Sequence, residues 1–274
     1  MSSILTNTGA MVALQTMRGI NKNLAQTQNE ISTGKTISNA RDNAAIWSIA
    51  KTMESDVSGF KAIGDSLGLA KSTVAVARVA AETVVDLMKE MKNILVAGTG
   101  ENVDHEKLAT DLEVLQNQIT SVLEAAQFNG LNLVNGDEDA AFISSLNRDG
   151  TGDPDVATIE VAAADLATEI DGTLTVAPTD ADTFTTALED FEADFQLAVA
   201  AAASFGAAEK RIDIQAEFVK NLSDAMTSGI GALVDADMEA ASAKLQALQV
   251  QQQLATQSLS IANQQPQNIL SLFR

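Results

Sequence analysis

A run of oxygen-bearing side chains near the middle of the sequence is the first candidate for a chemical site. Residues 147–155 carry Asn, Asp, Thr, Asp and Asp at alternate positions and a glycine at the sixth, which resembles the first half of a calcium-binding loop. The twelfth position is Thr158, where such a loop requires a bidentate glutamate. The flanking residues also alternate like strands rather than helices. We therefore interpret the run as an acidic turn exposed to solvent.

Three carboxylates offer a second candidate, because paired acids can perform glycoside chemistry. Asp190, Glu192 and Asp194 are spaced by two, so on a helix they do not share one face, and we expect a solvated surface. The chain has no cysteine, and a P-loop, a G-x-S-x-G elbow and an H-E-x-x-H motif are all missing. The sequence predicts neither an enzyme nor a cofactor.

The single histidine and the single tryptophan are weaker candidates. His105 stands alone near a predicted helix start, and one histidine cannot build a multi-histidine metal site. We expect it at the surface. Trp47 adjoins an apolar stripe, so packing is its expected role.

The charge distribution divides the chain into arms and an insert. The chain of 274 residues has 37 acidic and 17 basic side chains, for a net charge of −20. Residues 137–195 carry −15 of this and contain one base, Arg148, whereas the arms on either side carry −3 and −2. Such acidity argues against a nucleic-acid partner, because that affinity comes mainly from Lys and Arg. We expect the insert to face water.

The first arm reads as long helices. From 46 to 95, positions spaced alternately by three and four are apolar, with the single exception of Asp56. Such a stripe, here called a seam, packs helices side by side. The spacing predicts a helix over 43–97, about 80 Å long at 1.5 Å per residue. A second helix is expected at 104–127, with Asp104 as its N-cap.

The second arm repeats this pattern. One seam runs from Ala208 to Leu233 and another from Met238 to Ala262, with a hinge expected around Gly229, Gly231 and residues 233–237. We expect Pro266 to end the last helix. Short strands are predicted at 131–135, 141–146 and 156–163, a loop at 171–182, and a helix from about 183. The fold class is mainly α: a long antiparallel helical coiled-coil bundle with a small β-hairpin region inserted in the middle.

The chain ends carry few charges. Residues 1–29 contain two charged side chains and residues 240–273 contain one before the terminal arginine. Helices without a charged face favour burial against partners, although an ordinary hairpin within one chain fits equally well. A lipid-surface helix would need a face rich in Lys and Arg, and no uninterrupted apolar stretch is long enough to span a membrane. The beginning lacks the features of a cleaved signal peptide.

Three strings resemble conserved motifs of the bacterial flagellins. They are ISTGKTISNARDNAA at 31–45, QFNGLNLVNG at 127–136 and ANQQPQNILSLFR at 262–274. The similarity covers about 1–136 and 196–274. It implies a structural subunit that polymerises with many copies of itself into the filament of the bacterial flagellum and so enables motility. A hook–filament junction protein of the same export system is the alternative.

The resemblance also implies a layered subunit. Segments 1–40 and 234–274 would form an inner-tube domain that is disordered in the monomer, 41–136 with 183–233 a helical bundle, and 137–182 an acidic variable segment facing outward. The implied location is extracellular, in the filament. The implied partners are further copies, hook-associated junction proteins, filament cap proteins, an export chaperone and the type III export apparatus, without nucleic acid or membrane insertion.

The resemblance assigns subunit packing to particular residues. Arg41 and Asp42 fall in the turn before the long helix, where the family places polar contacts between subunits. At residues 88–93 the chain reads MKEMKN, without the arginine through which some flagellins are recognised by an animal innate receptor. The residues implied in inner-tube packing are Leu5, Leu14, Leu24, Ile31, Leu245, Leu248, Leu259, Leu270 and Leu272.

Overall fold

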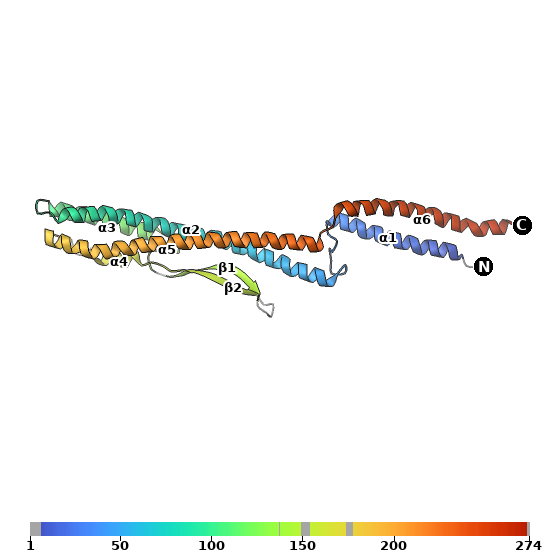
Figure 1. Ribbon diagram of the computed structural model, residues 1–274, viewed down its shortest axis with the longest axis horizontal. Coiled ribbons are helices and arrows are strands. Elements are labelled where there is room, and N and C mark those ends of the chain that lie inside the picture. The colour runs from blue at the N-terminus through green and yellow to red at the C-terminus, as the bar shows by residue number, and fades with distance from the viewer. Residues whose placement is uncertain (1–6, 137, 149–153, 174–177, 273–274) are drawn as a thin grey trace. The chain divides into compact units, whose positions relative to one another are not determined.

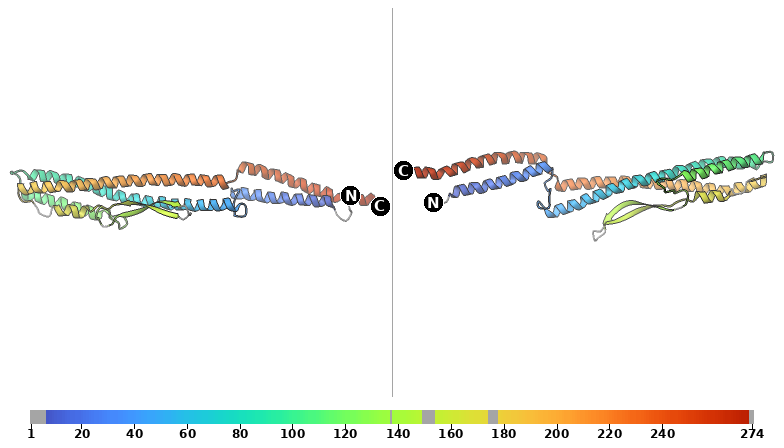
Figure 2. Two further views of the ribbon diagram at one scale, coloured as in Figure 1. Left: turned by 60° about the horizontal axis from the view of Figure 1, so that its bottom comes forward. Right: turned by 180° about the vertical axis from the view of Figure 1, so that it is seen from behind.

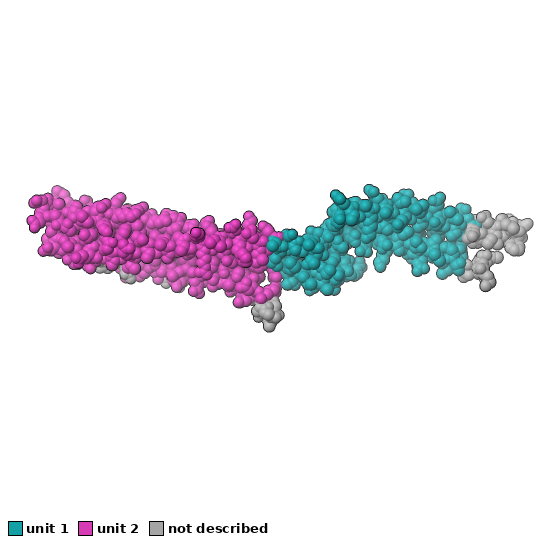
Figure 3. Space-filling view, viewed as in Figure 1, with its two compact units in different colours: residues 1–55, 225–274 teal, residues 56–224 magenta. Residues whose placement is uncertain are grey.

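The structure is a computed structural model, and it describes residues 7–136, 138–148, 154–173 and 178–272. Within these residues the chain forms six helices and one hairpin, which are labelled in Figure 1. The chain divides into two compact units, residues 1–55 with 225–274 and residues 56–224, which Figure 3 colours separately. The elements, in order, are α1 (Thr8–Thr33), α2 (Ala44–Gly98), α3 (His105–Ala125), β1 (Ala140–Arg148), β2 (Pro154–Val161), α4 (Leu166–Thr173), α5 (Ala181–Val234) and α6 (Met238–Leu272).

The core of the second unit is the predicted seam. In α2 every apolar seam position from Phe60 to Leu95 is buried, and Phe184, Phe191, Phe205 and Ile212 of α5 are fully buried. Figures 1 and 2 show α2 and α5 side by side along this unit. The heptad spacing explains the arrangement, because it keeps one stripe of each helix facing its neighbour.

A buried phenylalanine, Phe184, packs where α2 ends and α5 begins, and we call it the aromatic plug. Phe184 is fully buried, and its ring centroid lies 5.5 Å from that of His105. The Nε2 atom of His105 is 3.1 Å from the carbonyl oxygen of Gly98, one of the carbonyls left unpaired where α2 ends. The expectation of a surface histidine is therefore wrong, because the imidazole is part-buried and caps a helix.

The hairpin of β1 and β2 lies against the long helices of this unit at two polar points. The strands pair antiparallel, with a register shift between Ile143 and Ser145. Arg148 pairs with Asp56 of α2, and the side-chain amide of Gln215 on α5 donates to the carbonyl oxygen of Ser144 at 2.9 Å. Both Asp56 and Gln215 occupy seam positions, so these polar interruptions of the stripes mark where the hairpin docks.

The first unit is built around a second helical hairpin. α1 and α6 run antiparallel, and the side-chain amide of Asn7 donates to the carbonyl oxygen of Ala262 at 2.7 Å. Figures 1 and 2 show the two helices side by side. Their facing sides are the positions with the least exposure, Ala10, Ala13, Met17, Ile20, Leu24, Thr27 and Ile31 of α1 and Ala241, Leu245, Leu248, Gln252, Ala255, Leu259 and Ala262 of α6.

Several local expectations are corrected. The backbone of α6 continues through Pro266 to Leu272, because one missing N–H can bend a long helix without ending it. α5 likewise passes Gly229 and Gly231 and stops at Val234, so the break is confined to 235–237. Residues 131–135 form isolated bridges instead of a strand, and α4 occupies part of the expected loop.

Candidate subunit-packing surfaces

The residues implied in inner-tube packing fall into two groups. Leu24 and Ile31 of α1 and Leu245, Leu248 and Leu259 of α6 lie in the seam between these helices. Their apolar surface is therefore turned toward the same chain. Leu14 is exposed, Leu5 lies outside the described residues, and Leu270 and Leu272 lie where only the backbone is described. Their contacts with other copies stay a prediction.

The seam of α1 differs from the stripe that the sequence spacing predicts there, which is Ala10, Leu14, Met17, Asn21, Leu24, Gln28 and Ile31. It is displaced from that stripe by one residue at alternate steps. Ala13, Ile20 and Thr27 face α6, whereas their neighbours Leu14, Asn21 and Gln28 are exposed. The hydroxyl of Thr27 is fully buried and has no hydrogen-bond partner among the described residues. Both sets of positions are spaced by three and four residues, so the spacing does not distinguish them. The position of α6 decides which set is buried.

A second apolar stripe on this hairpin remains exposed. Met11 and Val12 of α1 are 66% and 63% exposed. On α6, Val250, Leu254 and Ile261 are 55%, 57% and 63% exposed. The latter recur at spacings of four and seven, a helical period that could have been found in the sequence beside the stronger seam. Another molecule can pack against these side chains while α1 and α6 stay packed against each other.

Arg41 and Asp42 lie in the turn between α1 and α2, as expected. Asp42 accepts hydrogen bonds from the backbone N–H groups of Ser38 and Asn39 at 3.1 and 3.2 Å and from the Ser38 hydroxyl at 3.2 Å. Burial would raise the pKa of the Asp42 carboxyl, but these hydrogen bonds and the adjacent Arg41 together hold it below its usual value. Asp42 orders the turn, and the exposed Arg41 side chain is left facing solvent.

The two connectors of the first unit are tied together. The N–H of Thr36 donates to the carbonyl oxygen of Val234 at 2.7 Å, and that of Ala236 donates to Gly34 at 2.9 Å. The Nζ of Lys35 lies 3.3 Å from Glu54 of α2. Gly34 has a φ of 69°, a conformation that favours glycine after a helix. The two connectors are therefore held together by backbone hydrogen bonds and do not form independent loops.

The candidates for chemistry do not form a catalytic or metal site among the described residues. No group of three His, Cys, Asp or Glu side chains there is placed to hold a metal ion. Asp194 is buried, which corrects its expected solvent exposure, and Glu192 pairs with Lys92. The calcium-like run falls largely at 149–153, outside the described residues. No helix within the described residues is both long and apolar enough to cross a bilayer.

Comparison with known proteins matches both arms. Residues 4–139 match the bacterial flagellin N-terminal helical region, and residues 193–273 match the bacterial flagellin C-terminal helical region. The chain is 41% identical to a flagellin of Brucella melitensis and 38% identical to flagellin C of Rhizobium meliloti, over 100% of each chain. The stretch between the two matches corresponds to most of the acidic insert.

A solved structure of a flagellar hook-associated protein from Vibrio parahaemolyticus resembles the fold. It has a TM-score of 0.52 and 14% identity, covering 71% of this chain and 100% of that one. This likeness concerns the fold alone, whereas the two full-length relatives above are flagellins. The chain therefore belongs to the bacterial flagellin family.

Proposed function

We propose that this chain is the structural subunit of the bacterial flagellar filament and that many copies polymerise into it. The observation that carries the proposal is the α1–α6 hairpin. One face of it closes within the chain, yet apolar side chains on both helices stay exposed. In water, exposed apolar stripes of this kind favour association. The full-length flagellin relatives favour the same role.

The layered arrangement belongs to this proposal. Segments 1–40 and 234–274 pack in the inner tube, where they are ordered by neighbouring copies. Segments 41–136 and 183–233 form the surrounding bundle. The segment 137–182 faces outward, where its acidic side chains stay hydrated. The filament lies outside the cell, and export, capping and junction proteins are the further partners.

The experiment that tests the role is assembly of the purified full chain. We expect seeds or a precipitant to produce long filaments visible by electron microscopy and recovered by sedimentation. A chain lacking residues 240–274 should stay in the supernatant, while circular dichroism still reports the helical bundle. Intact protein that stays monomeric under every condition would refute the filament role.

Point variants separate the exposed stripe from the fold. Leu254→Gln with Ile261→Gln should raise the critical concentration for assembly by tenfold or more, because two large apolar groups lose their partner. The matched control is Ile143→Gln on β1, which is 41% exposed in the proposed outward segment. Equal effects of the two changes would contradict the layer assignment.

A further inference from the structure

Two apolar side chains project from α5 within the second unit. Ile214 is 61% exposed and Phe218 is 55% exposed, although Ile212 and Val219 beside them are buried in the seam. Positions four apart lie on one face of a helix, so the two side chains form one protrusion. We call Ile214 and Phe218 the α5 knob.

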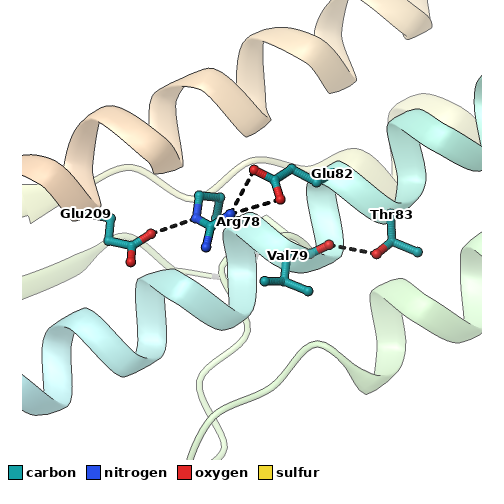
Figure 4. Close-up of polar contacts among 5 residues, drawn as sticks. All are labelled: Arg78, Val79, Glu82, Thr83 and Glu209. Atoms are coloured by element: carbon teal, nitrogen blue, oxygen red, sulfur yellow. Dashed lines mark hydrogen bonds and ion pairs between the residues drawn. The ribbon is translucent and has the colours of Figure 1, made fainter.

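The same unit contains a shallow apolar groove of about 480 Å³. Val79 is 52% exposed in it, and the Thr83 hydroxyl donates to the carbonyl oxygen of Val79 at 2.8 Å, so this hydroxyl is already paired within its own helix. Figure 4 shows Val79 and Thr83 beside this bond, while Arg78 points to Glu209 of α5. We call it the α2–α3 groove, and its walls include Ala75, Val76, Val79, Thr83, Val122 and Ala125.

The knob lies in a stretch of balanced charge within an acidic chain. Residues 209–220 contain Lys210, Arg211 and Lys220 against Glu209, Asp213 and Glu217, although the whole chain has a net charge of −20. Glu209 is paired with Arg78 of α2 at 2.6 Å. Asp213 is paired with Lys71 of α2 at 2.7 Å. Lys210 and Arg211, directly before the knob, have no ion-pair partner in the part of the chain that the structure describes.

Acidic side chains neighbour the lining residues of the groove along α2 and α3. Glu124 adjoins Ala125 at the end of α3, is exposed, and has no cation partner among the described residues. On α2, Glu82 and Asp86 are also exposed, and each already has a cation of its own helix, Arg78 and Lys89. The free carboxylate beside the groove therefore complements the free cations beside the knob.

We propose that the α5 knob of one copy inserts into the α2–α3 groove of a second copy. This inference rests on the proposed filament role and names two surfaces that would pair in it. The two surfaces differ, so the contact is heterologous, and repeated without closure it generates an open helical polymer. Lys210 and Arg211 then meet the acidic rim around Glu124 and set the register of the contact.

Cross-linking tests the pairing directly, because the chain has no cysteine. A Val79→Cys chain and a Phe218→Cys chain are mixed, assembled and oxidised, and dimers are counted on a denaturing gel. We expect the mixed filaments to give at least tenfold more dimer than the mixed monomers. The matched control replaces Phe218→Cys with Val114→Cys, a side chain on α3 that is 61% exposed. Filaments whose cross-linking is no greater than this control would overturn the knob-and-groove contact while leaving the filament role intact.

Charge reversal provides a second test that does not alter the apolar contact. Glu124→Arg and Arg211→Glu should each raise the critical concentration about two- to fivefold, as expected for a partly exposed pair. A chain with both changes should return to the wild-type value. If the two effects simply add, the groove accepts some other partner and the inference fails. Wild-type chain that never assembles would instead refute the filament role.

Discussion

At the residue scale, glycines in the long helices have very different surroundings. A Cβ built on Gly98 would lie 2.1 Å from the Cδ1 atom of Phe184, in the plug that closes α2 and α5. A Cβ on Gly68, in the exposed middle of α2, would meet nothing within 4 Å. Packing against Phe184 leaves no room for a side chain at Gly98. Gly68 lowers the stability of the helix, and no neighbouring atom requires a glycine there.

Alanine substitution should separate these two cases. Gly98→Ala should lower the free energy of unfolding by about 1–3 kcal/mol, because the buried ring must move. Gly68→Ala should raise it by about 0.5–1 kcal/mol, since alanine favours the helix. Urea unfolding followed by circular dichroism measures both values. Two substitutions that change stability in the same direction would contradict the plug.

The buried Thr27 hydroxyl predicts a stabilising substitution. An unpaired hydroxyl away from water costs free energy, so Thr27→Val should stabilise the α1–α6 packing by about 1 kcal/mol. The measurement is the temperature at which assembled filaments dissociate. Thr16→Val is the matched control, because that exposed hydroxyl donates to the carbonyl oxygen of Val12 at 3.0 Å. An increase that is equal for both variants would show that only helix propensity had changed.

At the element scale, two polar residues in apolar stripes hold the hairpin. Asp56 and Gln215 occupy seam positions where a leucine would normally pack, and both contact β1. The side-chain hydrogen bond and the charge of Asp56 raise the pKa of Arg148. The Asp56 side chain is only 14% exposed, so breaking its ion pair with Arg148 changes the surroundings of a nearly buried carboxylate.

Removing this ion pair should loosen the hairpin. In Asp56→Asn, amide hydrogen exchange in β1 should become about tenfold faster, while the buried core of α2 stays protected. Asp86→Asn is the control, because its pairing with Lys89 is made by a carboxylate that is 75% exposed. Unchanged exchange in β1 would mean that the Gln215 contact is sufficient to hold the hairpin.

The start of α3 predicts a pH effect. Asp104 accepts a hydrogen bond from the backbone N–H of Lys107 at 3.3 Å, and the Lys107 side chain and this backbone bond hold the pKa of Asp104 below its usual value. A lowered pKa means that the stabilisation is complete at neutral pH and disappears as the pH falls through the folded value. Asp104→Ala should therefore lower the Tm at pH 7 by a few degrees, and the difference should shrink by pH 2.5. Asp111→Ala, an exposed mid-helix acid, should show no such convergence.

The long helices could be predicted because the spacing of their apolar residues repeats over many turns. The contacts between one element and another could not be predicted in this way. Fifteen seam positions predict α2 to within a residue at each end. The one-residue displacement on α1 and the cap supplied by His105 depend on which surface lies opposite. The passage of α6 through Pro266 follows instead from the backbone, because a long helix can tolerate one missing N–H. Likewise, Asp56 is visible in the sequence as an irregularity, but only the hairpin gives it a partner.

At the scale of the whole molecule, the charge and the apolar surface are segregated along the chain. Residues 137–195 carry −15, while the arms that contain the seams, the knob and the groove are nearly neutral. Nearly neutral arms can approach other copies with little repulsion, and an acidic segment that faces outward, as proposed, would keep completed polymers apart. The same chain is thus suited to associate through its arms and to stay dispersed through its insert.

This segregation predicts how filaments respond to salt. Repulsion between the proposed outer segments acts over about 10 Å at 0.1 M salt and is screened above that concentration. The triple variant Glu138→Gln, Asp155→Asn and Glu160→Gln removes three exposed acids, so its filaments should bundle at roughly two- to threefold lower salt than wild type. Light scattering and electron microscopy measure the threshold.

The control for this last prediction removes the same charge elsewhere. Glu101→Gln, Glu106→Gln and Glu113→Gln change three exposed acids of the proposed bundle layer. If the acidic segment forms the outer surface, these changes should shift the bundling threshold much less, because the charges lie farther from a neighbouring filament. Equal thresholds would show that total charge alone governs bundling, and the outward placement of the insert would lose its support.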